Sequence, residues 1–313
     1  RFYWPGHQKD VRRWCRWCVE CATWKPTHGR PRAKLQPSVA GYAMERIGID
    51  FLGALPKTQR GNQYVLVVCD YFTKWVECFP LSDQRAETTA RTLVNRFGVP
   101  SAIHSDQGRD FESLLFQEIC QLLQVEKTRA TPYHPHSSGL VERFNRTIQQ
   151  MLALFVNENR NDWDELLPLT MAYRCSEHYS TGYTPNRLML GREVQLPIDL
   201  VVGVPPQQGS FSCHTAYAEH MQKAMNSTFQ FARQPLRRFA IKQKTVYDRK
   251  VRPQEFDLGN WVWYYYPPKA KQKLGRGWVG PYLVTEKFNC SLYHMQFHPE
   301  SRPRVIHVDS LRP

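Results

Sequence analysis

No stretch of the sequence approaches 18 consecutive apolar residues, so we predict no membrane-spanning helix. The first residues are basic and aromatic, so we do not expect them to act as a secretory signal. The first residue is Arg1 rather than methionine, and we expect it to lie inside a longer translation product. No internal repeat is visible. The 313 residues, 42% of them hydrophobic, are sufficient for two or three domains with apolar cores.

The cysteines lack a pattern that would pair them in disulfides. Their number, nine, is odd, which argues for a reducing compartment where most of them act as small apolar core residues. Three cluster near the start, at Cys15, Cys18 and Cys21. The other six are scattered among apolar residues, at Cys69, Cys78, Cys120, Cys175, Cys213 and Cys290.

Charge is distributed unevenly along the chain. The net charge of +14 divides into +7 for residues 1–38, −3 for residues 39–200 and +10 for residues 201–313. Basic ends around a slightly acidic middle are typical of a nucleic-acid-binding protein whose central part concentrates carboxylates for another purpose. Basic tails that are only solvated, or that bind anionic surfaces non-specifically, would give the same totals.

Residues 38–200 have the hydrophobic pattern of an α/β domain. Strands are predicted over 45–51, 63–72, 75–81, 101–104 and 125–130, and helices over 83–97, 111–123, 138–157 and 163–178. We expect Asp83 to cap the start of the first helix and Gly98 to end it. The order predicts a mixed five-stranded sheet, begun by an antiparallel meander, with helices on its faces.

The regions that flank residues 38–200 have a different composition and hydrophobic pattern. Residues 1–37 are rich in Trp, Arg and Pro and end in a linker-like run; the family resemblance given below implies that they are a partial helical segment. Residues 201–250 combine a Pro-rich linker with a basic helix. Residues 251–313 turn all-β, which favours a small barrel. We therefore divide the chain into 1–37, 38–200, 201–250 and 251–313.

Three acidic residues stand where metal chemistry is expected. Asp50 lies in an apolar strand, where a carboxylate is costly unless something pairs with it, and a cation would do so. Asp106 follows the short fourth strand, and Glu142 falls in the first turn of the long helix. Asp70, in another apolar strand, and Asp110 are competing candidates.

The long helix supports the choice of Glu142. Its apolar residues recur at spacings of three and four, which defines one core-facing stripe. The stripe consists of Val141, Phe144, Ile148, Met151, Leu152 and Phe155. Glu142, Arg146 and Gln149 share a different face, which can meet a polyanion. Three carboxylates from separate elements suit Mg²⁺, and two such ions about 3.5–4 Å apart can promote phosphoryl transfer without a Ser or Cys nucleophile.

A resemblance to a known family rests on this constellation. Asp106 and Glu142 are separated by 35 residues, and the segments 104–111 and 131–147 resemble those of gypsy-type LTR retrotransposon integrases of the D,D-35-E kind. One departure is His136, where the family more often has Gln. The resemblance implies an RNase-H-like core in which Asp50, Asp106 and Glu142 bind two Mg²⁺ or Mn²⁺ ions.

The resemblance also implies an activity and partners. The family trims the 3′ ends of element DNA and joins them to target DNA, so we expect double-stranded DNA, a homo-oligomer and nuclear action after a cytoplasmic particle. Tyr133, His134 and Gly139 would belong to a loop beside the site, and Asn145 and Arg146 would contact DNA. Tyr133 and His134 could instead only pack that loop.

The amino-terminal cysteines resemble part of the family's His-His-Cys-Cys zinc domain. Cys18 and Cys21 have the spacing of half a tetrahedral zinc site. The family's two His ligands precede this point, so Zn²⁺ would be bound completely only in a longer chain. His7 and His28 do not match those positions, and Cys15 has no role in the family.

The carboxy-terminal region resembles the family's GPY/F module at residues 278–282. That module is an SH3-like barrel used for DNA binding and multimerisation. Four basic residues lie beside its aromatic strands, which suits phosphate contacts or a solvated turn. They are Lys269, Lys271, Lys273 and Arg276. Trp261 and Trp263 share a face, and we favour a core role for them over base stacking.

Two rival functions remain at this point. The first is a domesticated DNA-binding protein derived from an integrase but catalytically inactive, against which the complete acidic triad argues. The second is an RNase-H-like nuclease acting on RNA–DNA hybrids. The basic barrel and the cysteine motif argue against the nuclease, because strand transfer requires two DNA molecules to be held together.

Overall fold

The computed structural model describes residues 3–18, 20, 33–36, 39–129, 139–196, 199, 201, 214–266, 277–298 and 300–313. Contacts group them into two compact units. One contains the described residues between 39 and 243, and the other contains those up to 36 and from 244 onward. The four-part division of the sequence stays a prediction.

The first unit is built on a five-stranded mixed sheet. Its strands are β1 (Arg46–Gly53), β2 (Tyr64–Asp70), β3 (Val76–Leu81), β4 (Ala102–Ser105) and β5 (Glu126–Arg129). They lie in the order β3-β2-β1-β4-β5, with β1, β2 and β3 antiparallel and β4 and β5 parallel to β1. The predicted meander and mixed sheet are therefore confirmed.

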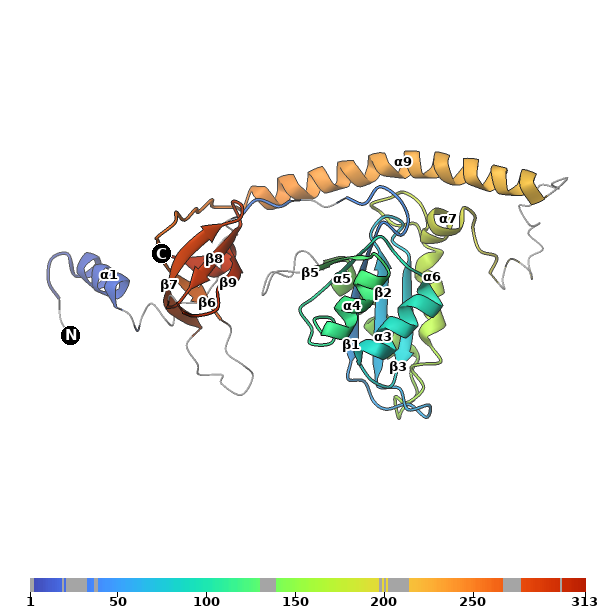
Figure 1. Cartoon of the computed structure of the whole chain (residues 1–313), viewed down its shortest axis with the longest axis horizontal. Coiled ribbons are helices and arrows are strands. Elements are labelled where there is room, and N and C mark those ends of the chain that lie inside the picture. Colours follow the sequence, from blue (N-terminus) through green and yellow to red (C-terminus); the bar gives the residue numbers. More distant parts are fainter. Residues whose placement is uncertain are drawn as a thin grey trace. The chain divides into compact units, whose positions relative to one another are not determined.

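Helices cover both faces of this sheet (Figure 1). On one face, α3 (Ala86–Thr92), the π-helical turn η1 (Leu93–Phe97) and α4 (Leu114–Leu122) pack on Ile47 and Ile49 of β1. On the other face, α5 (Gly139–Phe155) buries Val141, Phe144, Ile148 and Leu152 against β1 and β2. Because β2 has helices on both sides, six of its seven residues are buried, as its continuous apolar sequence predicts.

Three local predictions in this unit are wrong. Asp83 does not cap the first helix: that helix begins only at Ala86, and the Asp83 carboxylate accepts the backbone N–H of Arg85. Gly98 does end the helical segment, with φ at 106°. Phe155 closes α5 and is 60% exposed instead of joining the apolar stripe.

The third error concerns the helix predicted over 163–178. Trp163 is buried and donates its indole N–H to the carbonyl oxygen of Pro56 at 2.7 Å. The carboxylate of the next residue, Asp164, accepts hydrogen bonds from Thr58 and Asn62. These contacts hold the segment in turns, so only the short 3₁₀-helix η3 (Leu167–Leu169) and α6 (Thr170–Arg174) form.

Two further helices complete the first unit. The short helix α7 (Pro185–Leu190) was not predicted, whereas α9 (His214–Asp248) matches the expected basic helix. Leu236 and Ala232 of α9 pack on Phe72 and Leu188. None of the described helices is both long and apolar enough to cross a lipid bilayer.

The second unit contains an antiparallel five-stranded sheet. Its strands are β6 (Trp261–Tyr265), β7 (Trp278–Lys287), β8 (Leu292–Gln296), β9 (Arg304–His307) and β10 (Leu311–Arg312), in the order β10-β6-β7-β8-β9. A 3₁₀ turn, η4 (Val308–Ser310), joins the last two strands. The all-β character is confirmed, and closure into an SH3-like barrel stays a prediction.

The face assigned to Trp261 and Trp263 is wrong. The core of this sheet is formed by the alternate residues Val262 and Tyr264, and Trp261 is 58% exposed. Trp263 lies on the outer face, where the guanidinium of Arg312 stands 5.9 Å from its ring centre. Alternation along a strand determines which residues share a face. It does not determine which face is buried when, as here, both faces carry aromatic residues.

Residues 33–36 belong to the second unit and pack within it. Ala33 is buried in the core of the carboxy-terminal sheet, and its N–H donates to Asp309 at 3.3 Å. Leu35 donates its N–H to Asp248 at 2.9 Å. Upstream, α1 (His7–Trp17) has no buried residue among its described side chains.

Candidate active site

Asp50 lies on the face of the central strand that α5 covers. Along β1, Ile47 and Ile49 enter the core on the other face, so alternation sends Gly48 and Asp50 toward α5. The Asp50 carboxylate accepts hydrogen bonds from the N–H of Phe51 and from the side-chain amide of Asn145, both at 2.8 Å. The acid is thereby held in one orientation.

Asp106 follows β4, the neighbouring parallel strand. Because Ile49 pairs with Ser105 in the register, Asp106 comes next to Asp50 at the same end of the sheet. One carboxylate oxygen of Asp106 accepts the N–H of Gly108 at 2.9 Å, and its carbonyl accepts the hydroxyl of Ser105 at 2.8 Å. The side chain is exposed.

Glu142 is exposed in the first turn of α5, as predicted, and Gly48 lets that turn approach β1. A Cβ atom on Gly48 would stand 2.6 Å from Cγ2 of Val141 and 3.0 Å from Cε2 of Tyr71. Only a glycine at this point allows the helix that carries Glu142 to pack so closely beside Asp50.

The three predicted acids are electrostatically coupled. Burial first, and then the negative charges of Asp106 and Glu142, raise the pKa of Asp50 from its ordinary 3.8 to about 6, against the opposing hydrogen bonds from Phe51 and Asn145. A carboxyl whose pKa is raised by two other carboxylates is typical of a functional site. The structure thus places Asp106 and Glu142 near enough to Asp50 for their charges to shift its pKa, and the assignment of all three as catalytic residues stays a prediction.

Asp70, the competing acid in an apolar strand, has a structural role. Its carboxylate is fully buried and accepts the N–H groups of Met44, Phe72 and Thr73, together with the hydroxyl of Thr73. Desolvation raises its pKa, and these hydrogen bonds oppose the shift. An acid with its oxygens so occupied closes the turn after β2 and is a poor metal ligand.

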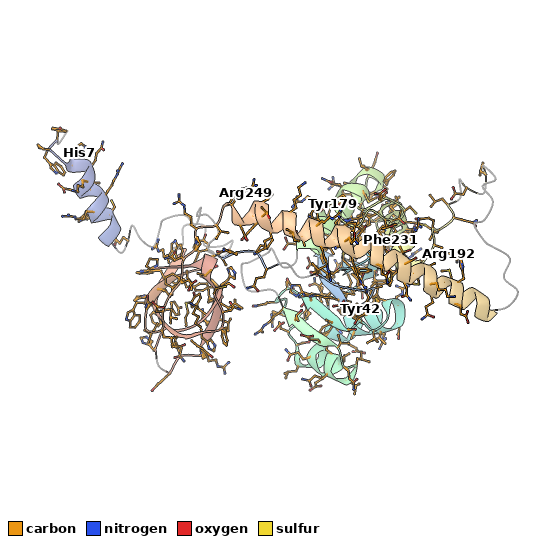
Figure 2. The ribbon with its side chains drawn as sticks, turned by 90° about the horizontal axis from the view of Figure 1, so that it is seen from above. His7, Tyr42, Tyr179, Arg192, Phe231 and Arg249 are labelled. Atoms are coloured by element: carbon orange, nitrogen blue, oxygen red, sulfur yellow. The ribbon has the colours of Figure 1, made fainter. Side chains whose placement is uncertain are left out.

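Arg143, which the sequence analysis did not single out, fixes the first turn of α5. Its guanidinium donates to the carbonyl of Gly139 at 2.7 Å and to the hydroxyl of Tyr179 at 3.0 Å. Tyr179 lies beside α9 (Figure 2), and its ring meets the edge of Phe239 at 5.0 Å. The sequence offers no sign of this contact, because Tyr179 is 36 residues further along the chain.

The predicted DNA-contacting residues are only partly described. Arg146 is exposed on the same helix as Glu142, whereas Asn145 is half-buried and bound to Asp50. The remaining predicted contacts and one zinc ligand lie outside the described residues, namely Cys21, Tyr133, His134, Lys269, Lys271, Lys273 and Arg276. Cys18 is described at the end of α1, and the ring of His7 packs against Tyr3 and Trp4.

The oxygen-rich chemistry around Asp50 suits a metal ion, although within the described ranges no group of three His, Cys, Asp or Glu side chains stands where it could hold one. The negative charges of Asp106 and Glu142 act on Asp50, and Oδ1 of Asn145 is buried beside it without a hydrogen-bond partner. Both features fit a divalent cation that prefers oxygen ligands.

Known proteins are similar to this chain in sequence and in fold. Residues 43–135 match the integrase core domain family. The chain is 24% identical over 319 residues to the retrovirus-related Pol polyprotein from transposon 412 of Drosophila melanogaster, covering 99% of this chain and 25% of that protein. It is 32% identical over 241 residues to the Pol polyprotein of radiation murine leukemia virus (strain Kaplan), covering 75% of this chain and 40% of that protein.

A solved structure supports the fold over nearly the whole chain. A chain of the simian T-cell lymphotropic virus intasome, determined in complex with PP2A regulatory subunit B56 gamma, superposes with a TM-score of 0.55. The match covers 97% of this chain and 90% of that chain at 17% identity. By these sequence matches the chain belongs to the retroviral-like integrases, and its likeness to transposon 412 is consistent with the gypsy type.

Proposed function

We propose that this protein is a DNA-joining enzyme, which removes nucleotides from the 3′ ends of element DNA and transfers those ends into target DNA. The observation that carries the proposal is the placement of three acids: Asp50 and Asp106 follow paired residues of the parallel strands β1 and β4, and Glu142 lies in the turn of α5 that packs on β1 at Gly48. The comparisons support it: residues 43–135 match the integrase core domain family, and the chain aligns with a quarter of the transposon 412 polyprotein.

In this proposal the three carboxylates hold two Mg²⁺ or Mn²⁺ ions. The ions would activate the attacking oxygen and stabilise the leaving one during in-line phosphoryl transfer. The protein's own residues supply the geometry: Asn145 and the Phe51 N–H orient Asp50, the Gly108 N–H orients Asp106, and the close packing at Gly48 brings Glu142 alongside.

DNA would lie along the exposed face of α5. Glu142, Arg146 and Gln149 are all exposed on that helix, which suits a cationic side chain contacting phosphate beside the acids. We extend the proposal to Gly139, which begins α5 rather than lying in a loop, and to Tyr133 and His134 earlier in the sequence.

The flanking regions would hold DNA and partner subunits. Residues 201–313 carry 17 Lys or Arg against seven Asp or Glu, which favours salt-dependent binding to phosphates. We propose that the carboxy-terminal sheet binds DNA and multimerises, that Cys18 and Cys21 bind Zn²⁺ together with upstream ligands, and that the homo-oligomer acts in the nucleus.

The test is a strand-transfer assay in Mg²⁺. Labelled oligonucleotides that copy the element's ends are mixed with a supercoiled target and with wild type or Glu142→Gln. The matched control is Glu118→Gln, which neutralises an exposed glutamate on α4. We expect joined products from wild type and from Glu118→Gln but not from Glu142→Gln. Tight, salt-dependent DNA binding without joining by wild type would instead favour the catalytically inactive DNA-binding protein.

A further inference from the structure

A network of charged side chains lies beside the candidate active site, at the end of β5. The carboxylate of Glu112 bridges two basic residues of that strand: it accepts Nζ of Lys127 at 3.2 Å and Nη1 of Arg129 at 2.9 Å. Lys127 and Arg129 are alternate residues and so share one face of the sheet. The Lys127 and Glu112 side chains are only 13% and 25% exposed, so solvent screens this pair less than an ordinary surface ion pair.

The network continues to the backbone of Asp106. Nζ of Lys127 also donates to the hydroxyl oxygen of Ser105 at 3.0 Å. That hydroxyl donates its own hydrogen to the carbonyl of Asp106 at 2.8 Å, and Ser105 is 1% exposed. An unbroken series of hydrogen bonds therefore runs from Glu112 through Lys127 and Ser105 to a candidate metal ligand.

Glu112 also anchors the loop that follows Asp106. Its N–H donates to the carbonyl of Gly108, the residue whose own N–H holds the Asp106 carboxylate. Phe111, next to it, stacks on Phe51 of β1 with ring centres 4.8 Å apart. Without the ion pairs, the outer part of this loop would keep its apolar contact but lose its tie to β5.

We propose that Glu112 is a positioning residue, which acts through Lys127 and Ser105 to hold Asp106 in the orientation that binds metal. The inference rests on the proposed function, because it assigns Asp106 to the metal. Glu112 itself would not touch metal or DNA. A substitution in the network should therefore reduce the free energy of metal binding more than it reduces the free energy of unfolding.

The test uses three variants that interrupt the network at different points. Glu112→Gln removes the charge, Lys127→Met removes the bridge, and Ser105→Ala cuts the link to Asp106 while leaving the ion pairs intact. The control is Glu165→Gln, which breaks an exposed ion pair with Arg60. The N···O distance of that pair, 3.0 Å, is similar to the distances from Glu112 to Lys127 and Arg129. Mn²⁺ binding is followed by the loss of the free-ion electron paramagnetic resonance signal, and thermal unfolding is recorded without metal.

We expect each network variant to weaken Mn²⁺ binding about three- to tenfold, less than the loss typical of a residue that touches a ligand directly, because Glu112 acts through two intermediates. DNA joining by the variants should need correspondingly more Mg²⁺, and its rate at saturating Mg²⁺ should stay within about twofold of the wild-type rate. The double variant Glu112→Gln/Lys127→Met should bind Mn²⁺ no more weakly than the worse single variant, because both interrupt one network.

Two outcomes would overturn the inference separately from the proposed function. If wild type binds Mn²⁺ and all three variants bind it equally well while unfolding at lower temperature, the network is only structural. If Ser105→Ala alone binds normally, Glu112 does not act through the Asp106 backbone. If wild type neither binds Mn²⁺ nor joins DNA, the proposed function fails first.

Discussion

The closest packing in the candidate site gives a sharp prediction. At Gly48 an added Cβ would lie 2.6 Å from Cγ2 of Val141, whereas carbon atoms in ordinary contact are separated by at least about 3.5 Å. Gly48→Ala must therefore push the first turn of α5 away from β1 by roughly 1 Å. Overpacking of this kind costs about 1–3 kcal/mol of unfolding free energy.

The larger expected effect of Gly48→Ala is on the rate of strand transfer. The displaced turn carries Glu142, and a misplacement of about 1 Å in a reacting constellation can lower the rate about 100-fold. We therefore expect Gly48→Ala to reduce strand transfer by up to about two orders of magnitude, while urea unfolding shows a loss of only about 1–3 kcal/mol. Gly41→Ala is the control, because a Cβ there would meet only the flexible Glu45 side chain, at 3.3 Å from Oε2.

A second-site variant separates displacement from simple loss of stability. Val141→Ala removes the methyl group that clashes, so the double variant Gly48→Ala/Val141→Ala should regain activity although the lost apolar burial keeps its stability low. Wild-type activity in Gly48→Ala would refute the reasoning. So would a double variant whose activity is the product of the two single losses, because relief of a shared clash cannot be additive.

Two further predictions concern pH. Because the pKa of Asp50 is about 6 in the folded protein and ordinarily 3.8, the folded state binds more protons between these values and wild-type stability falls as pH rises through them. Without metal at pH 7.5, Asp50→Asn should raise the urea unfolding free energy by up to about 3 kcal/mol, and the difference should vanish near pH 4; a difference that is the same at both pH values contradicts the assignment. Burial, aided by nearby cations, lowers the pKa of His104 and of His178 to about 4, so their stabilising contribution is complete above pH 6.5 and is lost as pH falls toward 4. His178→Gln should therefore flatten the dependence of unfolding free energy on pH in that window by up to about 1.4 kcal/mol per unit, and an unchanged slope would show that His178 protonates freely in the folded state.

Periodicity predicted the placement of the acids well. The apolar stripe of α5 left Glu142 outside the core, and the hydrophobic pattern assigned Asp50 to the first strand and Asp106 to the end of the fourth. These inferences depend only on the repeat of each element. Such information is local, so a single sequence carries it, whereas the parallel pairing of the first strand with the fourth came from the structure.

What the sequence could not provide is the set of donors around each polar group. Asp50 and Asp70 both look like costly acids in apolar strands, but three backbone N–H groups and a hydroxyl satisfy Asp70. Trp163 pairs with Pro56, a residue 107 positions away, and that contact replaces the predicted helix by turns. Tertiary partners of this kind decide the outcome and leave no trace in local spacing.

The contact of Ala33 and Leu35 with the carboxy-terminal unit has a consequence for synthesis. Their partners, Asp309 and Asp248, emerge from the ribosome more than 200 residues later. At a synthesis rate of about 5–20 residues per second, Asp248 is added roughly 10–40 s after Leu35, and Asp309 is added later still. The central sheet, whose described strands end by Arg129, can form during that delay. The second unit is thus completed last, by joining the two ends of a chain whose middle has already folded.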